Sequence, residues 1–105
     1  MNGLWITHFN AGPAHGHGLA VLRAGEILGG DFAHTWVGTY EEEGPSLYAR
    51  VRVTPYVDTQ NGEAAVPDRP VMMTLHGDCS ETDARLIGHA DDSEVMVSIE
   101  MHKAA

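Results

Sequence analysis

The sequence predicts an all-β protein, an eight-stranded antiparallel up-and-down β-barrel, and three observations lead to this fold class. Glycine is frequent, with 12 residues in 105, and glycine serves turns while weakening the interior of helices. Several short segments alternate apolar and polar residues with a period of two, which is the pattern of half-buried strands. No segment combines a helical period with capping residues. The length suits one domain, residues 1–105.

The predicted strands are short and separated by turn residues. The clearest alternation is in residues 46–57, where Leu47, Ala49, Val51 and Val53 fall on one face. Residues 58–70 contain Asn-Gly and two prolines, which predicts a long loop. Eight strands close into a small barrel, although a two-sheet sandwich predicts nearly the same pattern. The strands expected are residues 4–9, 18–23, 26–28, 34–40, 46–57, 71–76, 84–90 and 94–102.

The last predicted strand, residues 94–102, also alternates. It places Val95, Val97, Ile99 and Met101 on the face expected to point inward.

Residues 15–31 read HGHGLAVLRAGEILGGD and raise the question of a metal or phosphate site. His15 and His17 lie two positions apart, but no partner motif with zinc-ligand spacing accompanies them. The glycines precede a strand pattern instead of the helix N-terminus on which a pyrophosphate sits. We therefore predict a loop, a strand, a tight turn at Ala24-Gly25, a strand and a loop, with exposed loop histidines, no metal and no cofactor.

Charge and composition exclude several classes of function. The formal net charge of −9 argues against nucleic-acid binding, which needs clustered Lys and Arg. No apolar run is long enough to cross a bilayer, and no secretory signal is recognisable, so a cytoplasmic protein is expected. Cys79 is the single cysteine, and the neighbouring Asp78 and Glu81 would raise the pKa of its thiol. Since no Gly-x-Ser-x-Gly occurs either, we expect no catalytic residue and no enzyme.

An acidic run, Glu41 to Glu43, stands before Gly44-Pro45. Three adjacent carboxylates repel one another and belong in water, so a solvated hairpin tip is the simple interpretation. A docking point for a basic protein surface is the functional alternative.

Taken together, several motifs resemble the GrlR family of small negative regulators of type III secretion. They are Gly3-Leu4-Trp5-Ile6, Gly16-His17-Gly18-Leu19, Leu22, Gly25, Ile27, Gly29-Gly30-Asp31, Gly38, the acidic run and Met73-Thr74-Leu75-His76. The resemblance covers most of the chain and is densest over residues 3–43. It implies a lipocalin-like barrel that forms a homodimer and encloses an apolar cavity. It also implies that an acidic run after the fourth strand contacts a transcriptional activator, and Gly44 stands here where the family has a fourth carboxylate.

Two functions are therefore expected. The first is a non-enzymatic, GrlR-like regulator that binds a basic protein partner through an acidic surface loop of Glu41, Glu42 and Glu43. The alternative is a barrel that binds a small apolar ligand inside, because such sites are mostly apolar with few polar groups. The residues expected to line that cavity are Trp5, Leu47, Val51, Val53, Val97 and Ile99, with the Trp5 indole at its floor.

Overall fold

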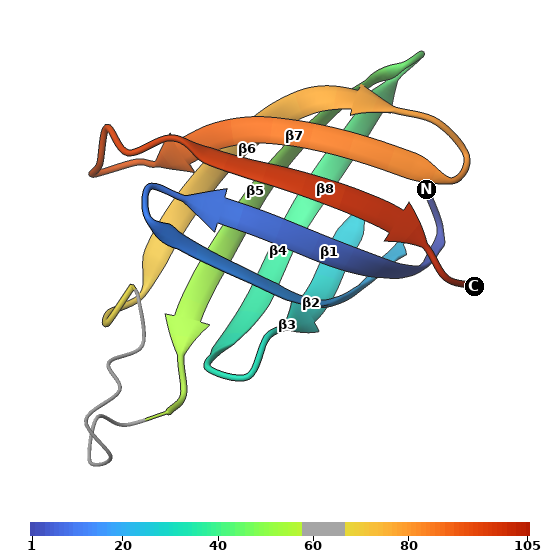
Figure 1. Cartoon of the computed structure of the whole chain (residues 1–105). Helices are drawn as coiled ribbons and strands as arrows, with labels where there is room; N and C mark the ends of the chain where they lie inside the picture. Colours follow the sequence, from blue (N-terminus) through green and yellow to red (C-terminus); the bar gives the residue numbers. More distant parts are fainter. Residues whose placement is uncertain (58–66) are drawn as a thin grey trace.

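A computed structural model describes residues 1–57 and 67–105 and confirms the predicted fold class. Every strand pairs antiparallel with the next in the chain, and β1 pairs with β8, so that the eight strands close into a barrel (Figure 1). Closure excludes the alternative of two separate sheets. The described residues contain no helix long and apolar enough to span a membrane. The strands are β1 (Gly3–Ala11), β2 (Ala14–Arg23), β3 (Glu26–Gly30), β4 (His34–Glu43), β5 (Ser46–Pro55), β6 (Val71–Cys79), β7 (Asp83–Ala90) and β8 (Val97–Lys103).

The turn between β2 and β3 is the tight one that the sequence predicts. Arg23 pairs with Glu26, which leaves Ala24 and Gly25 as the two turn residues. Their φ angles are 51° and 82°. Two successive positive φ angles are typical of a type I′ turn, whose twist matches that of the flanking strands.

The prediction of a loop around the first two histidines of the glycine-rich stretch is wrong. Strand β2 begins at Ala14, so His15 and His17 lie within it, opposite Asn10 and His8 of β1. Both histidines are exposed, while Gly16 and Gly18 between them face the inside of the barrel. The alternation therefore continues through this stretch, but with glycine at the inward positions, where a period-two search finds no apolar side chain.

The predicted eighth strand begins too early. Strand β8 starts at Val97, and Val95 is 52% exposed, so Val95 does not belong to the inward face. The inward positions predicted for Val97 and Met101 are confirmed by their burial. Of the predicted loop at 58–70, residues 58–66 lie outside the described part of the chain.

The core lies inside the barrel and follows the period-two pattern. Along β5, buried residues alternate with exposed ones, and Leu47, Ala49, Val51 and Val53 all point inward as predicted. The aliphatic inward residues of the other strands meet them across the barrel axis. The buried core consists of Trp5, Ala20, Leu22, Ile27, Tyr40, Leu47, Ala49, Val51, Val53, Leu75, Ala84, Leu86 and Met101.

Candidate ligand cavity

The barrel is hollow over part of its length. The barrel encloses a cavity in which the centre of a water molecule could occupy a volume of about 110 Å³. On the same measure, one bound water needs roughly 10–15 Å³. Most of the residues around this space are apolar, and the polar side chains Thr7, Asp31, His34 and Tyr40 are the exceptions. The lining comprises these four with Phe9, Ala11, Ala20, Leu22, Ile27, Trp36, Leu47, Ala49, Val51, Val53, Pro67, Met73, Leu75, Leu86, Val97, Ile99 and Met101.

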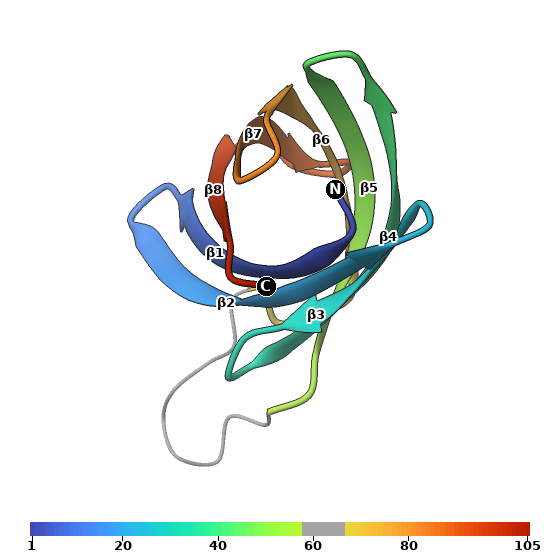
Figure 2. The same ribbon diagram turned by 90° about the vertical axis from the view of Figure 1, so that its right-hand side faces the viewer.

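One end of the barrel is filled by Trp5 and Met1. The Trp5 side chain is fully buried, and its Nε1 donates a hydrogen bond of 2.8 Å to the Met1 carbonyl oxygen. Met1 packs against the core, and Figure 2 shows the N-terminus within the ring of strands. The buried indole therefore has a polar partner, and the two residues close this end.

The cavity extends toward the opposite end, where the turn between β3 and β4 lies. There the Asp31 Oδ1 accepts hydrogen bonds from the backbone N–H groups of Ala33 and His34, each 2.7 Å long. The His34 Nδ1 lies 3.1 Å from the same oxygen, and its Nε2 lies 2.9 Å from the Pro67 carbonyl oxygen. The Asp31 carboxylate thus stabilises the turn between β3 and β4, and the His34 ring connects this turn to Pro67, in the segment that precedes β6.

Two aromatic rings form one wall of the cavity. Phe9 of β1 and Trp36 of β4 meet edge to face with 5.9 Å between their ring centroids. A Cβ atom at Gly16 would lie 2.6 Å from Phe9, and one at Gly18 would lie 2.6 Å from Trp36. The inward glycines of β2 therefore leave the space into which these two rings pack.

Thr7 supplies a polar atom in the middle of the apolar lining. Its side chain points inward from β1, two positions after Trp5, and the residue is 4% exposed. Its Oγ1 atom has no hydrogen-bond partner within the part of the chain that the structure describes. A buried hydroxyl without a partner loses the hydrogen bonds that water gave it, which costs free energy.

Five of the six residues predicted to line a cavity do so, namely Leu47, Val51, Val53, Val97 and Ile99. Trp5 is buried but is not among the lining residues. Sequence reasoning missed the polar lining residues and the aromatic wall. Two sequence signals accompany them. Asp31 of the motif Gly29-Gly30-Asp31 bonds Ala33 and His34 in the turn, and Gly18 of β2 leaves room for Trp36, which is distant in the sequence.

The acidic run is exposed but does not form a loop. Glu41 to Glu43 are the last residues of β4 and pair with Tyr48, Leu47 and Ser46 of β5. The turn itself is Gly44-Pro45, so the predicted acidic surface loop is corrected to a strand end. The Glu42 Oε1 lies 2.9 Å from the N-terminal ammonium group of Met1.

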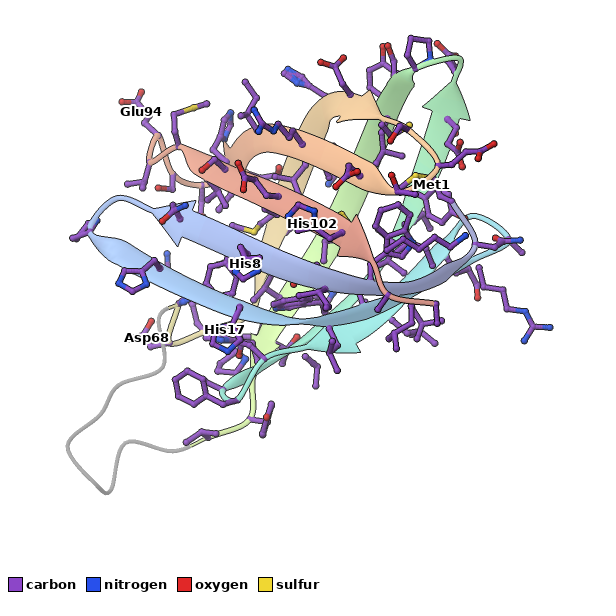
Figure 3. The ribbon with its side chains drawn as sticks, turned by 45° about the vertical axis from the view of Figure 1, so that its right-hand side comes forward. Met1, His8, His17, Asp68, Glu94 and His102 are labelled. Carbon is purple, nitrogen blue, oxygen red and sulfur yellow. The ribbon has the colours of Figure 1, made fainter. Side chains whose placement is uncertain are left out.

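Three histidines lie near one another on the outer surface, on β1, β2 and β8 (Figure 3). The ring centroids of His8 and His17 are 6.0 Å apart, and those of His8 and His102 are 6.2 Å apart. The His102 Nδ1 lies 2.6 Å from the Asp83 carboxylate. Hydrogen bonds from Thr82 and His102 lower the pKa of Asp83. Among the described residues, no group of three His, Cys, Asp or Glu side chains is placed to hold a metal ion.

Cys79, the single cysteine, is half-buried at the end of β6. Burial, followed by the nearby charges of Glu42 and Asp78, raises the pKa of its thiol. The thiol is therefore protonated near neutral pH and is a poor nucleophile.

Comparison with family models and with curated proteins finds no match for this chain.

Proposed function

We propose that this protein binds a small apolar molecule inside its barrel. The cavity itself carries the proposal, because interiors are normally packed to the density of organic crystals and leave few voids larger than a water molecule. Here a space of about 110 Å³ is surrounded mainly by aliphatic and aromatic side chains. A ligand that fills it gains contacts that the lining atoms otherwise lack.

The closed barrel supports this role because its wall is continuous. Every strand is hydrogen-bonded to two neighbours, so the cavity is held by the ladders of the sheet. Ligand sites of this kind are largely formed before the ligand arrives.

A neutral apolar dye tests the proposal. The fluorescence of N-phenylnaphthylamine is expected to rise when it is added to the folded protein, and Ala49→Leu, which narrows the cavity, should weaken the effect. Thr39→Leu is the matched control, since Thr39 is an exposed residue of the neighbouring strand. No rise with the wild-type protein, or equal losses in both variants, would contradict binding in the cavity.

We also propose a second function, that of a GrlR-like negative regulator of type III secretion. The observation that favours it is the exposure of all three glutamates at the end of β4, where Glu41 and Glu43 share one face of the strand and Glu42 lies between them, paired with the N-terminus. A basic surface, such as that of a transcriptional activator in the cytoplasm, would be drawn to these carboxylates.

Affinity capture with matched charge variants tests the regulator proposal. Replacing Glu41, Glu42 and Glu43 by glutamine should abolish the capture of a DNA-binding activator with a basic surface. The control replaces Glu26, Glu94 and Glu100, which are exposed elsewhere, and changes the net charge equally. Retention of the activator by the first variant, or the same loss in both variants, would speak against the acidic run as the contact.

For the homodimer, we propose the outer face of β2, β3 and β4 as the contact between two copies. Val21, Leu28 and Val37 lie directly opposite one another there and are 44%, 56% and 51% exposed. Because these three side chains are uncharged, two chains of net charge −9 can approach here without placing like charges in contact.

Light scattering after size-exclusion chromatography tests the proposed dimer. It should show a dimer that Leu28→Lys converts to a monomer, while Ile87→Lys on β7 leaves the dimer intact. A wild-type monomer would end this proposal.

A further inference from the structure

We infer that the ligand is electrically neutral and carries a single hydrogen-bonding group, which forms a hydrogen bond with the Thr7 hydroxyl. This inference rests on the proposed binding of a ligand in the cavity. It narrows the class of ligand to an apolar body with a hydroxyl, carbonyl or ester group and excludes fatty acids and other anions.

An anionic ligand would find no cationic side chain of lysine or arginine in the barrel. The chain has six lysines and arginines, all of them within the described residues and all exposed. None lines the cavity. Burying a charge without a partner is expensive, so a carboxylate head group is rejected. The six are Arg23, Arg50, Arg52, Arg69, Arg85 and Lys103.

The ionisable groups that do line the cavity are already engaged. The Asp31 carboxylate accepts two backbone N–H groups and contacts the His34 ring. Both ring nitrogens of His34 face an acceptor, one the Asp31 carboxylate and the other the Pro67 carbonyl. Neither side chain therefore offers a free partner for a charged ligand group.

The two hydroxyl groups that line the cavity differ, and the difference points to Thr7 as the anchor. The Tyr40 hydroxyl donates to the Asn2 Oδ1 at 3.3 Å, which leaves it engaged at the filled end. The Thr7 Oγ1 has no partner among the described residues, and Thr7 is 4% exposed. A hydroxyl both donates and accepts, so it pairs with a neutral polar group of either kind.

Displacement of N-phenylnaphthylamine by three ligands of one chain length tests the charge preference. A primary alcohol, the matching carboxylate and the matching alkane are compared near neutral pH, where the acid is ionised. The length is chosen as the best binder in a series from hexanol to dodecanol. We expect the dissociation constant of the alcohol to be at least about tenfold lower than that of the carboxylate, because the carboxylate would be buried without a counter-ion. A carboxylate that binds as tightly as the alcohol would overturn the inference.

Two variants of Thr7 test the anchor. Thr7→Val keeps the shape and removes the hydroxyl, so the alcohol should bind about twofold to tenfold more weakly while the alkane is unaffected. Thr7→Ser keeps the hydroxyl and should preserve the preference for the alcohol over the alkane. If Thr7→Val weakens alcohol and alkane equally, Thr7 is not the anchor. If the dye binds but the alcohol has no advantage over the alkane, this inference fails alone, whereas a protein that binds neither dye nor ligands also refutes the proposed function.

Discussion

The imidazole of His34 lies 3.1 Å from the carboxylate of Asp31, and both side chains are more than nine-tenths buried at one end of the barrel cavity. His34 also reaches the Pro67 carbonyl, 33 positions away in the sequence. The pair therefore joins the turn between β3 and β4 to the segment that precedes β6. Its role is structural, because the partners of the pair among the described residues are backbone groups, namely two N–H groups of the turn and the Pro67 carbonyl.

We predict that Asp31→Ala lowers the free energy of unfolding by about 1–3 kcal/mol, because two buried backbone N–H groups and the His34 ring lose their acceptor. Asp31→Asn should cost less, since an amide oxygen still accepts from the backbone. Urea denaturation followed by circular dichroism measures both changes. Asp68→Ala is the control, since Asp68 is exposed near the same end. Equal stability of the Asp31→Ala and Asp68→Ala proteins would show that Asp31 does not hold the turn.

Gly18 is expected to tolerate no side chain. A Cβ atom there would lie 2.3 Å from the Gly30 carbonyl oxygen and 2.6 Å from the Trp36 ring. Gly18→Val should therefore destabilise the barrel by about 1–3 kcal/mol, or prevent folding, because the backbone or the ring must move. The matched control replaces His15 and His17 by threonine, a good strand residue, and should change the melting temperature little because both histidines are exposed. A thermal melt that ranks the two changes in the opposite order would contradict this account of β2.

Alanine is not the preferred residue at position 24, the first residue of the turn between β2 and β3. Its φ of 51° lies in the left-handed region, where an L-residue with a Cβ is strained. Asn-Gly is the preferred pair for a type I′ turn, so Ala24→Asn should raise the free energy of unfolding by about 0.5–1 kcal/mol. Ala14→Asn serves as a comparison at a strand position and should not stabilise the protein. An unchanged urea midpoint for Ala24→Asn would count against the turn type.

Asp83 is expected to titrate below its ordinary pKa of 3.8, because hydrogen bonds from Thr82 and His102 favour the ionised carboxylate. A carboxyl group whose pKa is lowered by folding stabilises the protein above its ordinary pKa, and this contribution is lost as the pH falls through the lowered value. Thr82→Val removes the hydrogen bond that lowers the pKa of Asp83 most, so the pKa should rise. An NMR titration of the Asp83 carboxyl carbon measures the shift, and Thr54→Val on the distant β5 provides the control. An Asp83 pKa that is equal in wild type and Thr82→Val would refute the assigned cause.

Regular alternation allowed the inward face of a strand to be predicted, whereas the start of β2 could not be found from the sequence. Leu47 to Val53 could be placed inside the barrel because their period of two is a local property of the chain. The start of β2 was missed because glycine occupies the inward positions next to His15 and His17, so the alternation has no apolar side chain to reveal it. The sequence offers no partner motif for His17, although the fold brings His8 next to it, and His102 next to His8, on the outer surface.

The all-β class, most of the strands, the Ala24-Gly25 turn and the aliphatic lining of β5 could be predicted from the amino-acid sequence. Each of these follows from side-chain alternation and turn preferences over a few residues. Three features became visible only in the folded barrel: the sheet closes, Trp36 and Phe9 meet over two glycines, and the Thr7 hydroxyl faces an apolar space with no hydrogen-bond partner among the described residues. These features depend on contacts between residues far apart in the chain, and such contacts exist only after the barrel has brought its strands around a common axis.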